Sequence, residues 1–201
     1  MKVTRFEVLI NSGEFFSTKQ FNKVLKEIND AISQVVWPIN STHFSINPVL
    51  KGNGVKPIKN GCMSHLEKQG WKLEERLKIS RAMRPGPLDA VKALPNGGLL
   101  ALEWETGNIS SSHRALNKMV LGMLEGALCG GVLILPSRNM YKYLTDRIGN
   151  FQEIEPYFPQ WKRPDISNGF LAVIEIEHEY ENKDVPLIPK GTDGWAEFQG
   201  N

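Results

Sequence analysis

The chain has 201 residues, of which 41% are hydrophobic and 23% are charged, and its formal net charge at pH 7 is +2. These values are typical of a soluble globular domain and exclude a disordered tail, a coiled coil and a disulfide-stabilised mini-protein. We expect a single domain over residues 1–201, because a chain of this length buries a core without needing a disulfide between Cys62 and Cys129.

No segment of the chain indicates secretion or membrane insertion. No apolar run approaches the roughly 20 residues that a membrane-spanning helix requires. The first residues lack the apolar region and the cleavage site of a signal peptide. The sequence therefore predicts a cytoplasmic protein with no membrane partner.

Charge is distributed unevenly along the chain. Residues 51–84 contain nine Lys or Arg and three Glu, whereas residues 151–181 contain seven acidic and two basic residues. A basic segment on a nearly neutral protein is typical of a protein that binds an anion such as nucleic acid. Charge alone still favours the simpler interpretation, a solvated surface.

Two helices are expected in the first half of the chain. Residues 18–36 place apolar side chains at helical spacing behind Thr18, which can serve as an N-cap. Residues 38–61 are rich in Asn, Ser, Gly and Pro, which indicates a loop with short strands. Residues 62–80 again show a helical pattern, which ends before Pro85.

The second half predicts a hairpin and then a strand–helix–strand unit. Residues 88–94 and 99–105 have the pattern of strands, and the turn Pro95–Gly98 joins them. Strands that alternate with helices predict an α/β fold. The later elements are a helix that begins after Asn108, a buried strand over 131–135, a helix within 140–157, a strand over 170–176 and a C-terminal arm over 184–201.

Acidic side chains gather at the end of the second hairpin strand. Residues two apart in a strand share a face, so Glu103 and Glu105 point the same way, about 6.6 Å apart along the strand. Asp89 lies on the first hairpin strand, and three carboxylates converge if it pairs near Glu103. Such a cluster stays ionised only when a cation neutralises it. Because Mg²⁺ prefers oxygen ligands and accepts phosphate oxygens, the pattern predicts phosphodiester hydrolysis with one or two Mg²⁺.

Two other interpretations of the acids remain open. On spacing alone, Glu103 and Glu105 are more often ordinary glutamates on a solvated face. A pair of carboxylates could also serve glycoside hydrolysis, but no aromatic platform for a sugar can be assigned in this sequence.

Polar side chains mark the start of the helix that follows the acids. Helix N-termini bind phosphates through free N–H groups, and Asn108, Ser110 and Arg114 lie at or near this tip. Asn can read adenine and Arg can read guanine in the major groove, and Arg114 can lean back toward the tip. Simple capping by Asn108 is the plainer interpretation. His113 has no partner four residues on, which favours a surface or dimer-contact residue over a metal ligand.

A second polar pair, Asp146 and Arg147, could read one cytosine–guanine pair. Adjacent Asp and Arg more often form a surface ion pair worth under about 1 kcal/mol.

Several stretches together resemble the BamHI-type restriction endonucleases, and a compact member of that family in particular. They occur in the family's order and span most of the chain, and residues 103–114 are the most specific of them. The matching stretches are Gly86–Asp89, Leu102–Arg114, Tyr143–Arg147, Glu155–Phe158 and Val185–Gly194, with Trp37-Pro38 and Val55–Lys59 in addition.

The resemblance implies a central mixed β-sheet flanked by helices, the PD-(D/E)xK-like fold, and Mg²⁺-dependent cleavage of double-stranded DNA. Asp89 and Glu103 match the family's metal-binding acids, with the carbonyl of Trp104 as a further ligand. Glu105 stands where most nucleases of this fold carry lysine, and it matches the acid that orients or deprotonates the attacking water.

A fourth acid of the family, which also binds metal, lies shortly after a tryptophan. Glu74 matches it by its distance from Trp71, but Glu75 is adjacent and leaves that assignment open.

The resemblance also implies how DNA is read. The family's base-reading residues match Asn108, Ser110, Arg114, Asp146 and Arg147, so we expect the palindrome GGATCC, cut after the first G to leave 5′ overhangs. In addition, Lys59 would approach the DNA near the active site, and Gly194 lies in the segment 191–195 that would approach the minor groove.

A palindromic site calls for a two-fold symmetric protein. We expect a homodimer that packs through the helix 108–125 and the helix near 147–157, and the class implies a partner DNA methyltransferase. One alternative is a non-catalytic, sequence-specific dimeric DNA-binding protein such as a repressor, although the acids would repel DNA without a metal. A second alternative is a metal-dependent hydrolase of small phosphoesters.

Overall fold

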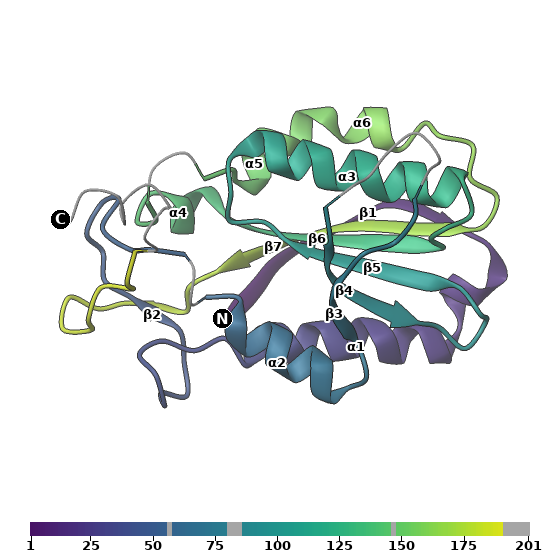
Figure 1. Ribbon diagram of the computed structural model, residues 1–201. Coiled ribbons are helices and arrows are strands. Elements are labelled where there is room, and N and C mark those ends of the chain that lie inside the picture. Colours follow the sequence, from purple (N-terminus) through teal and green to yellow (C-terminus); the bar gives the residue numbers. More distant parts are fainter. Residues whose placement is uncertain (56–57, 80–85, 146–147, 191–201) are drawn as a thin grey trace, which may run out of the picture.

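A computed structural model describes residues 1–55, 58–79, 86–145 and 148–190. Over these residues the centre of the molecule is a mixed sheet with the strand order β1-β7-β6-β5-β4-β3 (Figure 1). Its strands are β1 (Lys2–Ser12), β3 (Lys72–Glu75), β4 (Leu88–Ala93), β5 (Leu99–Trp104), β6 (Gly130–Pro136) and β7 (Gly169–Glu177). A small parallel sheet pairs β2 (Ser45–Ile46) with β8 (Tyr180–Glu181).

Helices cover both faces of the large sheet (Figure 1). On one face lie α1 (Lys19–Ser33) and α2 (Asn60–Lys68), and on the other lies α3 (Ile109–Leu124) together with α5 (Phe151–Ile154) and α6 (Phe158–Trp161). Shorter helical turns complete the chain: η1 (Glu14–Ser17), α4 (Arg138–Tyr141) and η2 (Glu155–Tyr157). None of the helices in the described ranges combines the length and the apolar character needed to cross a membrane.

Strand directions follow from the connections. The hairpin β4–β5 is antiparallel, whereas β5, β6 and β7 run parallel because helical segments connect them. β1 closes one edge antiparallel to β7, and β3 closes the other edge antiparallel to β4. The mixed sheet flanked by helices that we expected is confirmed.

The side chains of β5 alternate between two hydrophobic clusters. Leu100 and Leu102 pack with the helices α1 and α2, and Ala101 packs with α3. This alternation points Glu103 toward α3, as the strand period predicts. The sheet therefore places the Glu103 side chain on the face that α3 covers.

One predicted helix was wrong in its second part. The expected helix over 62–80 ends at Lys68, and residues 72–75 form β3 instead. Gly70 adopts φ +82, a left-handed conformation that stops the helix, and Trp71 is buried with its indole N–H donating to Glu27 at 3.0 Å. The charged residues that follow give an apparent helical pattern, but their backbone pairs with β4.

The helix predicted within 140–157 was also wrong, because the described residues there form only the short turns α4, α5 and η2. The sequence analysis assigned no element to the residues of β1, and the remaining predicted elements differ from the structure mainly at their ends. Asn53 fixes the first part of the C-terminal arm, because its Oδ1 accepts from the Ile188 amide at 3.2 Å and its Nδ2 donates to the Tyr143 carbonyl at 3.0 Å. Residues 191–201 of the arm lie outside the described residues.

Candidate active site

Two acids face each other across the β4–β5 hairpin. The register pairs Ala90 with Leu102, which places Asp89 opposite Glu103. The Asp89 amide donates to Oε2 of Glu103 at 3.3 Å, and the Trp104 amide donates to Oδ2 of Asp89 at 2.8 Å. The hairpin thus brings these carboxylates together, as the sequence predicted.

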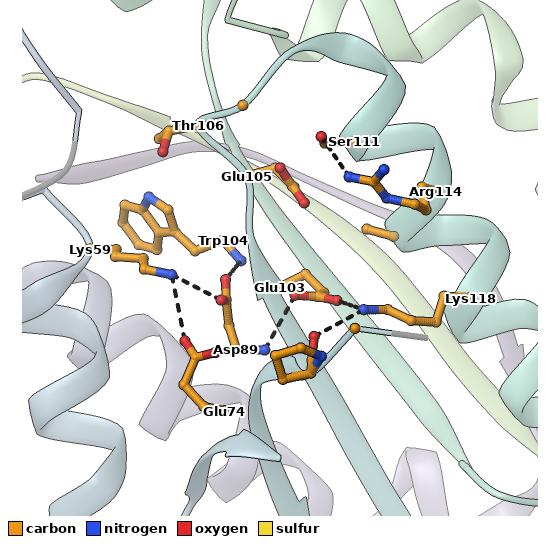
Figure 2. Close-up of a pocket in the computed structure, with 14 residues that line it drawn as sticks. Lys59, Glu74, Asp89, Glu103, Trp104, Glu105, Thr106, Ser111, Arg114 and Lys118 are labelled. Atoms are coloured by element: carbon orange, nitrogen blue, oxygen red, sulfur yellow. Dashed lines mark hydrogen bonds and ion pairs between the residues drawn. The ribbon is translucent and has the colours of Figure 1, made fainter. Parts of the chain in front are cut away.

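Both acids line one pocket of about 670 Å³ beneath the N-terminal half of α3 (Figure 2). Four carboxylates and three cationic side chains contribute to its wall: Glu74, Asp89, Glu103 and Glu105 against Lys59, Arg114 and Lys118. The site therefore contains nearly balanced charge when every group is ionised.

One carboxylate oxygen of Asp89 and one of Glu103 each form an ion pair with a lysine. Lys59 extends from the start of α2 and places Nζ 2.9 Å from Oδ1 of Asp89. Lys118 extends from α3, forms an ion pair with Oε1 of Glu103 and donates to the Pro87 carbonyl at 3.2 Å (Figure 2). Lys59 was expected to approach DNA, whereas Lys118 was missed from the sequence.

A signal for Lys118 was present in the helical spacing. Ser111, Arg114 and Lys118 recur at three and four residues, so they share one face of α3. All three line the pocket. On this helix, the sequence predicted DNA contacts only for Asn108, Ser110 and Arg114.

Glu74, rather than Glu75, faces the pocket. Glu74 lies 4.0 Å from Nζ of Lys59, whereas Glu75 lines a different, smaller pocket with Leu77 and Val91. Glu74 also adopts φ +50, a left-handed conformation that is uncommon for a residue other than glycine and is concentrated at functional sites. The geometry thus favours Glu74 for the role that the sequence left open between the two.

Glu105 follows directly after β5 and is half-buried. Its amide donates to the Ile134 carbonyl at 2.8 Å, which continues the sheet by one residue. Burial, reinforced by the negative charges of Glu103 and Asp89, raises the pKa of Glu105 to about 7, although Arg114 opposes the shift. Glu105 therefore exchanges a proton near neutral pH.

The pKa of Glu103 is also raised, because the carboxyl is buried. The ion pair with Lys118 opposes that shift. For Lys59, burial lowers the pKa, but the hydrogen bond and charge of Asp89 outweigh it and raise the pKa above its usual value. Lys59 therefore remains a cation at neutral pH.

The three acids do not converge on a single point. No three His, Cys, Asp or Glu side chains in the described part of the chain lie close enough together to hold a metal ion jointly. Asp89 and Glu103 are joined by the hydrogen bond from the Asp89 amide to the Glu103 carboxylate, whereas Glu105 shares only the pocket with them. The predicted cluster of three is therefore a contacting pair with a third acid in the same pocket.

The donor set nevertheless fits Mg²⁺. Two carboxylates on adjacent strands face one pocket, and each has one oxygen paired with a lysine side chain rather than with a main-chain amide. Mg²⁺ usually binds through one or two carboxylates and keeps several waters, so a cluster of three is not required. Trp104 lines the same pocket.

The tip of α3 forms as the sequence predicted. Asn108 is the N-cap, and its Oδ1 accepts from the Ser111 amide at 3.3 Å and from the Ser110 hydroxyl. Arg114 is exposed and leans back toward the tip, where it donates to Oγ of Ser111 at 3.0 Å. Asn108 and Ser110 are also exposed, so all three side chains are accessible to a ligand.

Three predicted site residues, Asp146, Arg147 and Gly194, fall outside the residues that the structure describes. His113 packs against Tyr157, with ring centroids 4.5 Å apart, so it joins α3 to η2 within the chain.

The chain is similar to restriction enzymes over most of its length. Residues 1–195 match the family model described as restriction endonuclease BamHI. The chain is 60% identical over 196 residues to the type II restriction enzyme OkrAI of Oceanobacter kriegii, covering 98% of this chain and 99% of that protein. It is 39% identical over 186 residues to the type II restriction enzyme BamHI of Bacillus amyloliquefaciens, covering 89% of this chain and 84% of that protein.

A solved structure supports the fold independently. Restriction endonuclease BglII in complex with a DNA 16-mer matches with a TM-score of 0.54, covering 89% of this chain and 81% of that chain. The sequence identity of this match is 8%, so the likeness concerns the fold alone.

The raised pKa of Glu105 predicts a pH-dependent stability. Because folding raises this pKa from 4.5 to about 7, the stability falls as the pH rises from about 4.5 to about 7 and changes little above that range. In EDTA we expect Glu105→Gln to lie close to the parent protein near pH 5 and to exceed its stability by about 2–3 kcal/mol near pH 8.5. Urea unfolding at both pH values measures the difference, and an equal difference at both would contradict the assignment.

Proposed function

The chain belongs to the BamHI family of restriction endonucleases and is a site-specific deoxyribonuclease, and we propose that it hydrolyses double-stranded DNA at GGATCC with Mg²⁺. The observation that carries the proposal is the contact between Asp89 and Glu103 in a pocket beneath the exposed tip of α3. This arrangement places candidate metal ligands and candidate DNA-reading residues within one site.

Asp89 and Glu103 would hold the metal ion, with the carbonyl of Trp104 and the carboxylate of Glu74 at the edge of the site. A bound Mg²⁺ supplies Lewis-acid stabilisation of phosphate charge and lowers the pKa of water. Glu105, whose pKa is about 7, is suited to orient the attacking water and accept its proton.

In-line attack by water on the phosphorus forms a new P–O bond and breaks the bond to the 3′ oxygen. The proposed products are a 5′-phosphate and a 3′-hydroxyl, with cleavage after the first G of the site. Lys59 and Arg114 are the cationic groups of the pocket wall that can approach phosphate oxygens.

Sequence reading is assigned to side chains at the tip of α3. Asn108, Ser110 and Arg114 are exposed there, and base-edge contacts in the major groove need accessible groups of these types. The assignments of Asp146, Arg147 and Gly194 rest on the resemblance. Agreement of the base-reading residues with the family's set supports GGATCC as the target.

We also propose that the protein acts as a homodimer through α3 and the adjoining helical segment α5–η2. Leu124 on α3 is 58% exposed and Tyr157 on η2 is 48% exposed, although both are large apolar side chains. A second copy would cover them and place two α3 tips on a palindrome. A DNA methyltransferase of the same specificity is the expected partner in the cell, because cleavage of host DNA must be prevented.

A plasmid with one GGATCC site provides the direct test. With Mg²⁺ we expect a single linear product with four-base 5′ overhangs, and with EDTA we expect intact plasmid. The control plasmid carries one altered base pair in the site. Binding without cutting under both conditions would favour a repressor-like protein, and cleavage of a nitrophenyl phosphodiester alone would favour a small-molecule phosphoesterase.

Removal of a metal-binding acid should separate cutting from binding. We expect Glu103→Ala to reduce the cleavage rate at least about 1000-fold, because it removes a metal ligand. DNA affinity should be preserved or improved, since one negative charge beside the phosphates is lost. Unchanged turnover in this variant would refute the metal assignment.

The neighbouring glutamates of β3 provide a matched pair. Because Glu74 faces the pocket and Glu75 does not, Glu74→Gln should slow cleavage about tenfold or more while Glu75→Gln cleaves like the parent. Single-turnover rates at saturating protein measure both. Equal rates for the two variants would show that Glu74 has no role in cleavage.

Arg114 should contribute to sequence discrimination. We expect Arg114→Ala to lose about 10–100-fold in preference for guanine at one position of each half-site, since a good bidentate contact is worth about 1–3 kcal/mol. Cleavage of duplexes substituted one base pair at a time measures this loss. Lys26→Ala, on the opposite face of the sheet, is the control, and intact discrimination by Arg114→Ala would place base reading elsewhere.

A further inference from the structure

Each of the two paired acids has one rigid and one mobile partner. Asp89 Oδ2 accepts from the Trp104 amide at 2.8 Å, and Oδ1 contacts Nζ of Lys59 at 2.9 Å. Glu103 Oε2 accepts from the Asp89 amide at 3.3 Å, and Oε1 contacts Nζ of Lys118. The hairpin fixes the amides, whereas each lysine reaches its carboxylate from a helix (Figure 2) through a four-carbon stem with several rotatable bonds.

We propose that Lys118 is an internal counter-ion of Glu103, which takes the place of a divalent cation and yields that place when the cation binds. This inference rests on the proposed function, because the divalent cation is part of it. Lys118 is thereby a positioning residue that controls the charge and the orientation of Glu103.

The burial of this ion pair distinguishes it from a surface salt bridge. The side chains of Lys118 and Glu103 are 10% and 7% exposed. A carboxylate this buried is costly without a positive partner, because water no longer stabilises its charge. Lys118 supplies that partner while no metal is bound.

If Lys118 moves away from Glu103, its ammonium still has a hydrogen-bond acceptor. Its ammonium also donates to the Pro87 carbonyl at 3.2 Å, a neutral group just before β4. A divalent cation on Oε1 would lie beside the ammonium if Lys118 stayed, and like charges a few ångströms apart repel strongly in a partly buried site. Binding of a cation at Oε1 therefore requires Lys118 to withdraw.

Two opposite effects follow for a variant without this charge. Lys118→Met keeps much of the side-chain volume and removes the ammonium, so metal-free protein carries an uncompensated buried carboxylate. We expect its thermal midpoint in EDTA to fall by roughly 5–10 °C. We expect the Mn²⁺ concentration that half-saturates its thermal stabilisation to be at least about fivefold lower than for the parent, because no ammonium competes.

The experiment is thermal unfolding of the full chain without DNA, in EDTA and across a Mn²⁺ titration at pH 8. Lys118→Arg keeps the positive charge and should remain near the parent in both readouts. Lys92→Met is the matched control, because Lys92 is also largely buried and pairs with Glu27 at 3.0 Å, outside the pocket. It should lower the thermal midpoint without changing the half-saturating Mn²⁺ concentration.

The outcomes separate this inference from the proposed function. A parent protein without any Mn²⁺-dependent stabilisation would contradict the metal site and the counter-ion with it. If the parent is stabilised by Mn²⁺ but Lys118→Met needs the same or a higher Mn²⁺ concentration for half-saturation, only the counter-ion role of Lys118 is contradicted. If Lys118→Met folds only with Mn²⁺, the inference is supported; if it folds under neither condition, Lys118→Gln replaces it with the same expectations.

Discussion

The register of the β4–β5 hairpin is the constraint on which the site depends. Pairing of Ala90 with Leu102 sets Asp89 opposite Glu103, and main-chain amides then fix one oxygen of each carboxylate. A slip of one residue would turn one of the acids to the other face of the sheet. The two acids therefore meet because the hydrophobic residues of both strands specify a single register.

Helix α3 connects this chemistry to the proposed DNA contact. Its first turn exposes Asn108 and Ser110, its second presents Arg114, and its third sends Lys118 down to Glu103. One helix thus carries both the side chains proposed to contact DNA and the lysine that pairs with Glu103. The repulsion of DNA that bare acids would cause is reduced, because each paired carboxylate already contacts a lysine.

The sequence predicted the parts of the site that local patterns determine. Strand alternation placed Glu103 on its face, and the cap at Asn108 placed the start of α3. Helical spacing places Lys118 on the same face as Arg114, but its ion pair with Glu103 depends on the distance between α3 and β5, which the spacing does not give. The strand β3 was mistaken for helix because its charged residues lack an apolar alternation, and the choice of Glu74 over Glu75 required the backbone conformation of that strand.

A crystal structure of the protein with Mn²⁺ would locate the metal ion relative to the paired acids. We expect an anomalous difference peak within about 2.0–2.4 Å of one oxygen from Asp89 and one from Glu103, with Nζ of Lys118 withdrawn from Oε1 of Glu103. A peak bound to only one of these carboxylates, or located outside the pocket, would contradict the proposed metal site.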